Sequence, residues 1–304
     1  IWTRYLSYGD KLYGTDFCIQ NEKIYVSTYH SHAFFSLESA KFGYYTLDMQ
    51  GNLLSDTLFP VSTTTSSNAY DTSYTIKIYA DSSNVYFSSY QSNVVPLSNK
   101  MHRSHNGLFA PPFNLYMGQY TTIDPLTLID FDSTRIMGLG TTGPNTHHYK
   151  VVSMTKAALD TAFYPLPVLN NTIFINLFKA SSSQVLISTR STAINPIRES
   201  AGLLLYDLVT QDTIWSNLSD PDYITYTAAF VKAQTDNDSS IYAITTRGPK
   251  AEVKKINLST GQTQWVSVFQ DTINNIQYQF FDADYNPYYE KYVAAGQRKI
   301  ITGT

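Results

Sequence analysis

The chain has 304 residues, of which 43% are apolar, and this fits one large all-β domain with a packed core rather than a disordered chain. Its net charge of -3 argues against a general nucleic-acid binder, which would carry a basic stripe. No apolar run approaches the length needed to cross a bilayer.

Residue usage favours strands and an exported protein. Only 15% of the residues are charged, whereas the chain holds 25 Tyr, a residue type that favours strands. Low charge with abundant Tyr and Thr is more typical of an exported surface protein than of a cytosolic enzyme, so we expect an extracellular or cell-surface location. The chain begins at Ile1 without a Met or a signal peptide, and we expect a mature or excised segment whose targeting sequence is missing.

The single cysteine, Cys18, excludes an internal disulfide. We expect it to be a small buried apolar residue. Both a reducing compartment and a disulfide-poor secreted protein remain compatible with this usage.

A strand-like run followed by a small polar tail recurs along the chain. Successive copies begin 61, 50, 50, 56 and 51 residues apart, at residues 24–28, 85–89, 135–139, 185–189, 241–245 and 292–296. A second run that ends in Asp or Asn follows most copies, at Asp48, Asp124, Asp207 and Asn257. We expect these residues to form turns. Eight residues later the chain has Asp56, Asp132, Trp215 and Trp265, so an aromatic ring is present in only some units.

The best-defined copy of the second run is residues 254–265, which predicts a strand, a tight turn and a strand. Gly261 supplies the reversal, because glycine takes positive φ without a steric cost, and Trp265 then offers a large ring to bury.

A period near 50 residues with several strands per unit predicts an all-β β-propeller, because stacking completes the core that one small sheet cannot bury alone. We expect one domain, 1–304, with six four-stranded blades; seven blades and an open stack of sheets are the alternatives. The predicted blades are residues 10–60, 74–132, 133–165, 170–216, 224–270 and 276–304, the last completed by residues 1–6. In that last unit we expect a short third strand at 299–302, and pairing of the chain ends would protect both sheet edges.

The longest insertion, residues 91–114, belongs to the second predicted blade. It holds three prolines, so we expect irregular structure there and a loop that is either solvated or used for binding.

The units resemble the extracellular β-propeller repeats of bacterial surface proteins and the related pyrroloquinoline-quinone-like repeats. The residues that carry the resemblance are 21–26, 48–54 and 255–261 with Trp265. The resemblance implies the fold and little about function, since such propellers host many functions. The quinone-dependent dehydrogenases of this fold usually have eight Trp-bearing blades, so three Trp and six units count against that activity.

Histidines and arginines mark the predicted connections between second and third strands. The histidines fall in three consecutive units, at His30, His32, His102, His105, His147 and His148, and the later units carry Arg190, Arg247 and Arg298. We expect one face with His on one half and Arg on the other. It could bind Zn²⁺ or Cu²⁺ through imidazoles, or a carboxylated or sulfated polymer through arginines. The alternative is that all are ordinary solvated loop residues.

Four Asn-x-Ser/Thr sequons occur, at Asn170, Asn217, Asn237 and Asn257. They are glycosylation acceptors if the source is a eukaryote and the chain is exported, and chance matches in a Ser/Thr-rich sequence otherwise. Asn257 lies in the repeated turn, where its role is explained by turn formation alone.

The sequence therefore predicts a non-enzymatic exported propeller that binds, adheres or serves as a structural module in a cell-surface or extracellular assembly. We expect a protein or carbohydrate partner, no nucleic acid, no membrane span and no cofactor, with a metal at the His-rich face as an alternative. The rival function is a polysaccharide-active, lyase-like enzyme, which would need a general base within reach of a charge-neutralising group.

Overall fold

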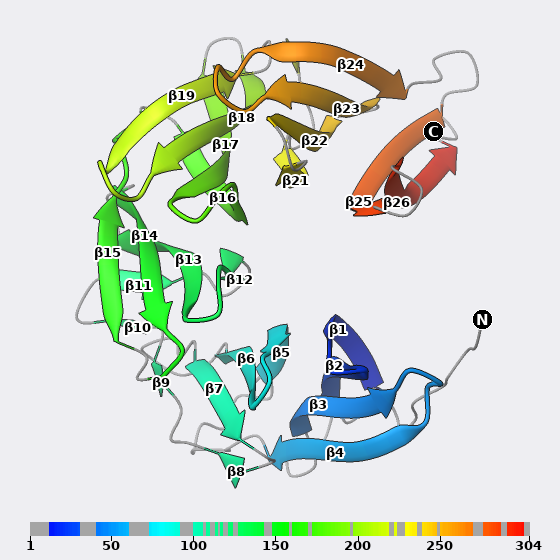
Figure 1. Ribbon diagram of the computed structural model, residues 1–304. Coiled ribbons are helices and arrows are strands. Elements are labelled where there is room, and N and C mark those ends of the chain that lie inside the picture. The colour runs from blue at the N-terminus through cyan, green and yellow to red at the C-terminus, as the bar shows by residue number, and fades with distance from the viewer. Residues whose placement is uncertain are drawn as a thin grey trace. The chain divides into compact units, whose positions relative to one another are not determined.

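A computed structural model describes residues 12–30, 41–60, 73–91, 100–105, 108–109, 113–114, 116–117, 121–123, 127–142, 148–157, 160–169, 172–194, 197–218, 222–223, 229–235, 239–247, 250–269, 276–286 and 291–300. In these residues the strands form six antiparallel sheets (Figure 1). Over the same residues, no helix combines the length and the hydropathy that crossing a membrane requires.

The first two sheets hold the strands that precede residue 115. The first sheet has the order β1 (Leu12–Gln20), β2 (Lys23–His30), β3 (Lys41–Asp48) and β4 (Leu53–Pro60). The second has the order β5 (Ser73–Ala80), β6 (Asn84–Gln91), β7 (Lys100–His105) and β8 (Leu108–Phe109), and β9 (Phe113–Asn114) also pairs with β7.

The third and fourth sheets follow. The third has the order β10 (Tyr116–Met117), β11 (Thr121–Ile123), β13 (Arg135–Thr142), β14 (His148–Thr155) and β15 (Thr161–Pro165), and β12 (Ile129–Asp130) pairs with β13. The fourth has the order β16 (Thr172–Lys179), β17 (Gln184–Ile194), β18 (Ile197–Asp207) and β19 (Asp212–Leu218), and β20 (Asp222–Tyr223) pairs with β18.

The last two sheets complete the described chain. The fifth has the order β21 (Ala229–Thr235), β22 (Ser240–Arg247), β23 (Lys250–Asn257) and β24 (Thr263–Phe269). The sixth pairs β25 (Ile276–Asn286) with β26 (Lys291–Ile300).

The chain divides into two compact units. Unit 1 comprises residues 1–144 and 154–161, and unit 2 comprises residues 145–153 and 162–304, so the division passes through the third sheet. Each unit has its own core.

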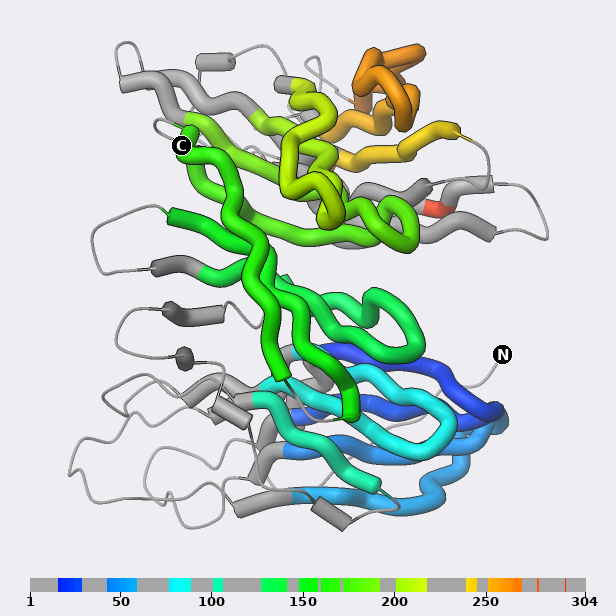
Figure 2. The backbone as a smooth tube through the Cα atoms, turned by 60° about the vertical axis from the view of Figure 1, so that its left-hand side comes forward, coloured from blue at the N-terminus to red at the C-terminus, as the bar shows by residue number. Residues whose placement is uncertain are grey.

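The core of unit 1 lies between the first and second sheets, whose strands β1 and β5 lie side by side in Figures 1 and 2. Tyr44 of β3 packs there with Ile78 and Phe87 of the second sheet. Cys18 packs against this cluster, and burial, with smaller effects of two nearby aspartates, raises the pKa of its thiol to about 12. The thiol is therefore protonated at neutral pH, as expected of a packing residue.

The core of unit 2 lies between the fourth and fifth sheets. Leu203 and Leu205 of β18 face Ile241 of β22 and Ile256 of β23, and all four side chains are buried. Alternate residues of each strand supply this face, as the two-residue period of a strand requires.

The small polar tail of the first repeated run has a structural role. The first strands β1, β5, β16, β21 and β25 each contain a one-residue β-bulge. In three sheets a buried serine of the second strand hydrogen-bonds backbone at this irregularity: Ser27 Oγ donates to Asp16 O, Ser88 Oγ accepts from Lys77 N, and Ser188 Oγ accepts from Asn176 N. The hydroxyl thus satisfies a main-chain group beside the interrupted ladder.

The repeated Asp and Asn residues form turns, as the sequence predicts at three of the four positions. Asp48 accepts from the backbone N–H of Gln50 and Asn52, and Asp207 accepts from those of Val209 and Thr210. Asn257 does the same for Ser259 and Thr260, whereas Asp124 lies outside the described residues. These bonds are Asx turns, in which the side chain replaces a backbone acceptor.

Three predicted elements differ from the structure. His102 and His105 lie within strand β7 rather than in an irregular insertion, because Lys100–His105 pairs with β6 as the third strand of its sheet. The run at Thr121–Ile123, predicted to lie within the second unit, pairs with β13 in the third sheet. The third strand expected at 299–302 is not formed by Lys299 and Ile300, which continue β26 and pair with β25. The predicted closing strand, residues 1–6, lies outside the described residues.

Candidate functional site

A polar groove lies between the first two sheets, within unit 1. It has a volume of about 590 Å³, within the range of small-ligand sites. Its polar lining comes from the β1–β2 turn, from β3 and β4, and from the β5–β6 turn with Ser104; the residues are Asn21, Lys23, Thr46, Ser55, Asp56, Thr57, Asp81, Ser82, Ser83, Asn84 and Ser104. Hydroxyl, amide and charged groups therefore dominate its wall.

Two tyrosines also line the groove. Tyr44 is 3% exposed, and its hydroxyl donates to Ser104 Oγ at 3.1 Å, which joins β3 to β7. Tyr25 meets the Tyr44 ring edge-on, with ring centroids 6.1 Å apart. Burial, followed by the proximity of Tyr44 and Cys18, raises the pKa of Tyr25, so its hydroxyl stays protonated and can donate a hydrogen bond.

Ser55 leaves part of the groove open because its side chain is small. In the fourth sheet Tyr206 pairs with Thr213, and Trp215 follows two residues later. In the first sheet Leu47 pairs with Leu53, and Ser55 follows two residues later. Ser55, rather than the predicted Asp56, is therefore the counterpart of the tryptophan, because the turn after Asp48 is one residue shorter. A small hydroxyl side chain stands here where another sheet carries an indole ring.

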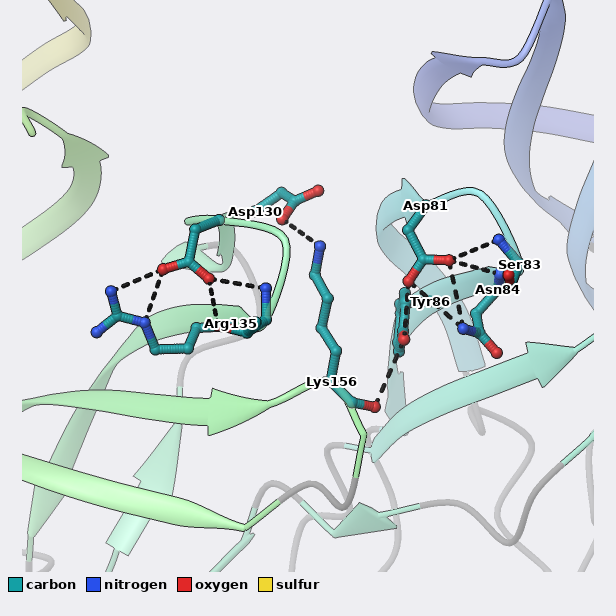
Figure 3. Close-up of polar contacts among 9 residues, drawn as sticks. Asp81, Ser83, Asn84, Tyr86, Asp130, Arg135 and Lys156 are labelled. Carbon is teal, nitrogen blue, oxygen red and sulfur yellow. Dashed lines mark hydrogen bonds and ion pairs between the residues drawn. The ribbon is translucent and has the colours of Figure 1, made fainter. Parts of the chain in front are cut away.

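The turn at Asp81 joins the groove to a second polar cluster in unit 1 (Figure 3). Asp81 accepts from the backbone N–H of Ser83 and Asn84, and it also accepts from the Tyr86 hydroxyl at 3.1 Å. Its burial, which acts in the opposite direction, is outweighed by these bonds, and the pKa of Asp81 is lowered. The groove wall at this point is consequently an ionised carboxylate that accepts several hydrogen bonds.

The cluster contains a buried lysine. Lys156 Nζ lies 2.7 Å from Asp130 Oδ1 and also lies over the ring of Tyr86, and the lysine side chain is 6% exposed. The backbone carbonyl of Lys156 accepts from Arg103 and lies 3.4 Å from the Tyr86 hydroxyl. Figure 3 shows Asp130 and Tyr86 on either side of this lysine. The contacts join the second and third sheets, which indicates a structural role.

The predicted histidines occupy different environments. His102 is buried and stacks on Phe87 with ring centroids 4.7 Å apart, so it is a packing residue of the core between the first two sheets. His105 Nδ1 lies 3.2 Å from Asn84 Oδ1. His30 is the last residue of β2 and His148 the exposed first residue of β14, while His32 and His147 lie outside the described residues. Among the residues that the structure describes, no three His, Cys, Asp or Glu side chains are placed to hold a metal ion.

The predicted arginines all lie in strands of unit 2. Arg190 is in β17 opposite Ala201, and its Nε is buried without a hydrogen-bond partner among the described residues. Arg247 is the last residue of β22, and Arg298 is near the end of β26. The sequence did not predict the groove, because its lining comes from residues far apart in the chain.

Two of the four sequons lie in the described residues, and both asparagines are engaged. Asn217 Nδ2 donates to the carbonyl of Gly261 and lies 3.3 Å from Thr263 Oγ1. Asn257 Oδ1 accepts from its own turn, including the Ser259 hydroxyl at 2.7 Å. Asn170 and Asn237 lie outside the described residues, and glycosylation of all four stays a prediction.

Comparison with known proteins identifies the fold. No protein-family model matches the chain, and no curated protein matches it in sequence. Among solved structures, the Dos1 propeller is similar with a TM-score of 0.53 and 11% identity, over 93% of this chain and 65% of that chain. A structure from a study of two prolyl endopeptidases has a TM-score of 0.50 and 13% identity, over 92% of this chain and 38% of that one.

The fold is of the β-propeller kind. The successive antiparallel sheets of the described residues, together with the similarity to the Dos1 propeller, agree with the predicted class. The chain spans less than two thirds of the length of either solved structure. At these identities the likeness concerns the fold, since propellers with one architecture serve many functions.

Proposed function

We propose that this propeller is a non-enzymatic exported binding module that takes a hydroxyl-rich carbohydrate chain in the groove of unit 1. It would act at a cell surface or in an extracellular assembly, without a cofactor. The observation that carries this proposal is the polar groove of about 590 Å³ lined by hydroxyl, amide and carboxylate groups beside two tyrosines.

The chemistry of the lining favours a sugar over an apolar ligand. Serine and threonine hydroxyls both donate and accept, and Asn84 and Asp56 add amide and carboxylate groups that match sugar hydroxyls. Tyr25 offers an apolar ring with a polar tip. Charges of both signs line the groove, from Lys23 and two aspartates, so a neutral glycan fits better than a strongly acidic one.

The test is calorimetric titration of the purified protein with neutral and acidic oligosaccharides. Ser55→Trp places an indole at the position that Trp215 occupies in the fourth sheet, and it should weaken binding of neutral oligosaccharides at least tenfold. Asp56→Ala should weaken binding less. Asp212→Ala removes an exposed carboxylate from strand β19 and should leave affinity unchanged, which makes it the matched control.

Binding that survives Ser55→Trp would overturn the groove as the site. Release of unsaturated sugar products during the titration would instead favour the lyase-like function. Each variant is first checked for an unchanged circular dichroism spectrum, so that loss of folding is not mistaken for loss of the site.

A second candidate, binding of a carboxylated or sulfated polymer by the arginines of unit 2, has one observation in its favour. Arg190 carries a buried Nε without an acceptor among the described residues, and a guanidinium is suited to bidentate contacts with such anions. Replacing Arg190, Arg247 and Arg298 with Ala should abolish binding of a sulfated polysaccharide. Unchanged affinity of the triple variant would remove this candidate.

A further inference from the structure

The fifth sheet ends at a strand without a charged side chain. This strand, β24, is the outer strand of its sheet and pairs with β23 in the described chain (Figure 1). All of its residues are exposed, among them Trp265 at 44%, Val266 at 45% and Val268 at 51%. The sequence holds no charged residue from Ile256 to Gln270. An outer strand has backbone N–H and C=O groups on its far edge, so β24 presents hydrogen-bonding groups together with apolar side chains.

The strands at the same edge of the first four sheets carry features that oppose edge pairing. β4 contains Asp56 and ends in Pro60, β15 ends in Pro165, and β19 begins with Asp212. The outer strand of the second sheet, β8, has only two residues. A charge, a proline and a short length each hinder a strand from joining a foreign edge. β24 has none of the three, so its edge lacks the protection that the others have.

We propose that β24 pairs antiparallel with β24 of a second copy of this chain, so that the two fifth sheets form one continuous sheet across a two-fold axis. The same surface then serves both subunits, as a two-fold interface requires. The proposal concerns assembly and is independent of the groove in unit 1.

The residue pattern of β24 is self-complementary about Ser267. When Ser267 lies opposite its own copy, Trp265 lies opposite Phe269 of the partner subunit, and Val266 lies opposite Val268 of the partner subunit. Opposite residues share a face of the sheet, so the aromatic pairs gather on one face and the valine pairs on the other. Each pair occurs twice, because the axis repeats every contact. A centre at Val266 would instead place Trp265 opposite serine and lose both kinds of pair.

Charges on the neighbouring strand β23 agree with this register. Lys254 lies beside Val266 and Glu252 lies beside Val268. The row of side chains that crosses the dimer therefore runs from Lys254 through two valines to Glu252 of the partner subunit, and its two ends have opposite charges. An uncharged strand also suits a second copy in particular, because self-pairing places a side chain near its own copy and a charge would repel itself. The occupant that β24 fits best is therefore another copy of the chain.

The interface should be weak. A pair of strands of seven residues each makes a small interface, below about 1,200 Å², for which transient association is typical. We therefore expect a reversible dimer with a dissociation constant on the order of micromolar.

Sedimentation velocity of the purified protein, from submicromolar to several hundred micromolar, measures the monomer–dimer equilibrium. Ser267 is exposed at the centre of the pairing. Ser267→Asp and Ser267→Lys each place like charges on both sides of the axis, so each should weaken dimerisation at least about tenfold. An unmodified chain that stays monomeric at every concentration would overturn the proposal. That result is expected if residues of the same chain outside the described ranges, such as 1–11, or a different protein cover β24.

Mixing the two variants separates loss of pairing from loss of folding. Opposite charges then meet across the axis, so the mixture should form a heterodimer at least about tenfold more tightly than either variant dimerises alone. The matched control is Ile214→Lys in β19, because Ile214 is also on an outer strand and is 44% exposed, and its dimerisation should equal that of the unmodified chain. Unchanged dimerisation in both Ser267 variants, a mixture that stays monomeric, or equal weakening by Ile214→Lys would overturn pairing through β24.

Discussion

At the scale of single residues, the repeated turns depend on a few side chains with exact geometry. Gly261 has a φ of +70° and lies under the ring of Trp215, so it meets two demands that only glycine satisfies together. Gly51 has a φ of +83° in the turn that follows Asp48, where the same Asx arrangement recurs. The glycine and Asx positions are therefore fixed by backbone geometry.

Gly261→Ala should lower the free energy of unfolding by about 2–4 kcal/mol. The substitution combines the cost of a left-handed backbone with a Cβ placed 2.6 Å from the Trp215 ring. Urea denaturation measures the change. In a Trp215→Ala background the same substitution should cost only the backbone part, about 1 kcal/mol; an undiminished cost there would show that the ring is not responsible.

Acid stability should depend on Asp132. Burial raises the pKa of this carboxyl, but hydrogen bonds from Thr134 and Arg135, with the charge of Arg135, outweigh it and lower the pKa to about 2. The stabilisation is present above the unfolded value of about 4 and is lost as the pH falls toward 2.

Asp132→Asn should therefore remove about 1–2 kcal/mol of stability at pH 7 and much less at pH 2. Thermal unfolding across this pH range provides the measurement. A deficit in the variant that does not shrink between pH 4 and pH 2 would contradict the assignment.

At the scale of elements, sheets within each unit are joined by side chains that reach the backbone or a charge of the next sheet. The Tyr206 hydroxyl donates to the carbonyl of Pro165 at 2.8 Å. Likewise, Trp215 Nε1 donates to the carbonyl of Leu258. In unit 1, Lys156 after β14 pairs with Asp130 of β12 and contacts Tyr86 of the second sheet. Such bonds align neighbouring sheets more specifically than apolar contact does.

The pair Lys156 and Asp130 should respond asymmetrically to substitution. Asp130→Asn leaves a buried ammonium without its counter-charge and should lower the free energy of unfolding by about 1–3 kcal/mol. Lys156→Met keeps the packing against Tyr86 and leaves the partly exposed Asp130 to water, so it should change stability by less than about 1 kcal/mol. Guanidinium denaturation compares the two variants, and equal losses would argue against the buried pair.

At the scale of the whole molecule, burial differs between a second strand of the fourth sheet and the outer strand of the fifth sheet. Residues 185–189 in β17 are all buried, whereas every residue of β24 is exposed. Second strands are covered by neighbouring strands on both edges and by neighbouring sheets, and outer strands are not.

Amide hydrogen exchange should therefore be slowest in the second strands. We expect residues 185–189 and 136–139 to exchange at least a hundredfold more slowly than β24 and β19, measured by mass spectrometry of peptides after timed exchange. Comparable rates in β24 and β17 would contradict this order.

The repeat, the strands and the propeller class could be predicted from the sequence because they follow from local chemistry. Alternating apolar residues, Asx-Gly turns and a period near 50 residues recur whatever the neighbouring sheets do. The location of the paired strands at 24–28 and 185–189 and the turn role of Asp48, Asp207 and Asn257 are confirmed. The binding role of the histidines and arginines stays a prediction.

Tertiary structure alone decided the groove and the two tryptophan environments. The groove joins Asn21, Ser55 and Asn84, whose proximity depends on sheet packing. Because the turn after Asp48 is one residue shorter, Ser55 rather than Asp56 is the counterpart of Trp215. Likewise Trp215 and Trp265 have the same local pattern, yet one is covered and the other is exposed. The physical reason is that a strand's own residues set its face and its turns, whereas the next sheet sets what lies against that face.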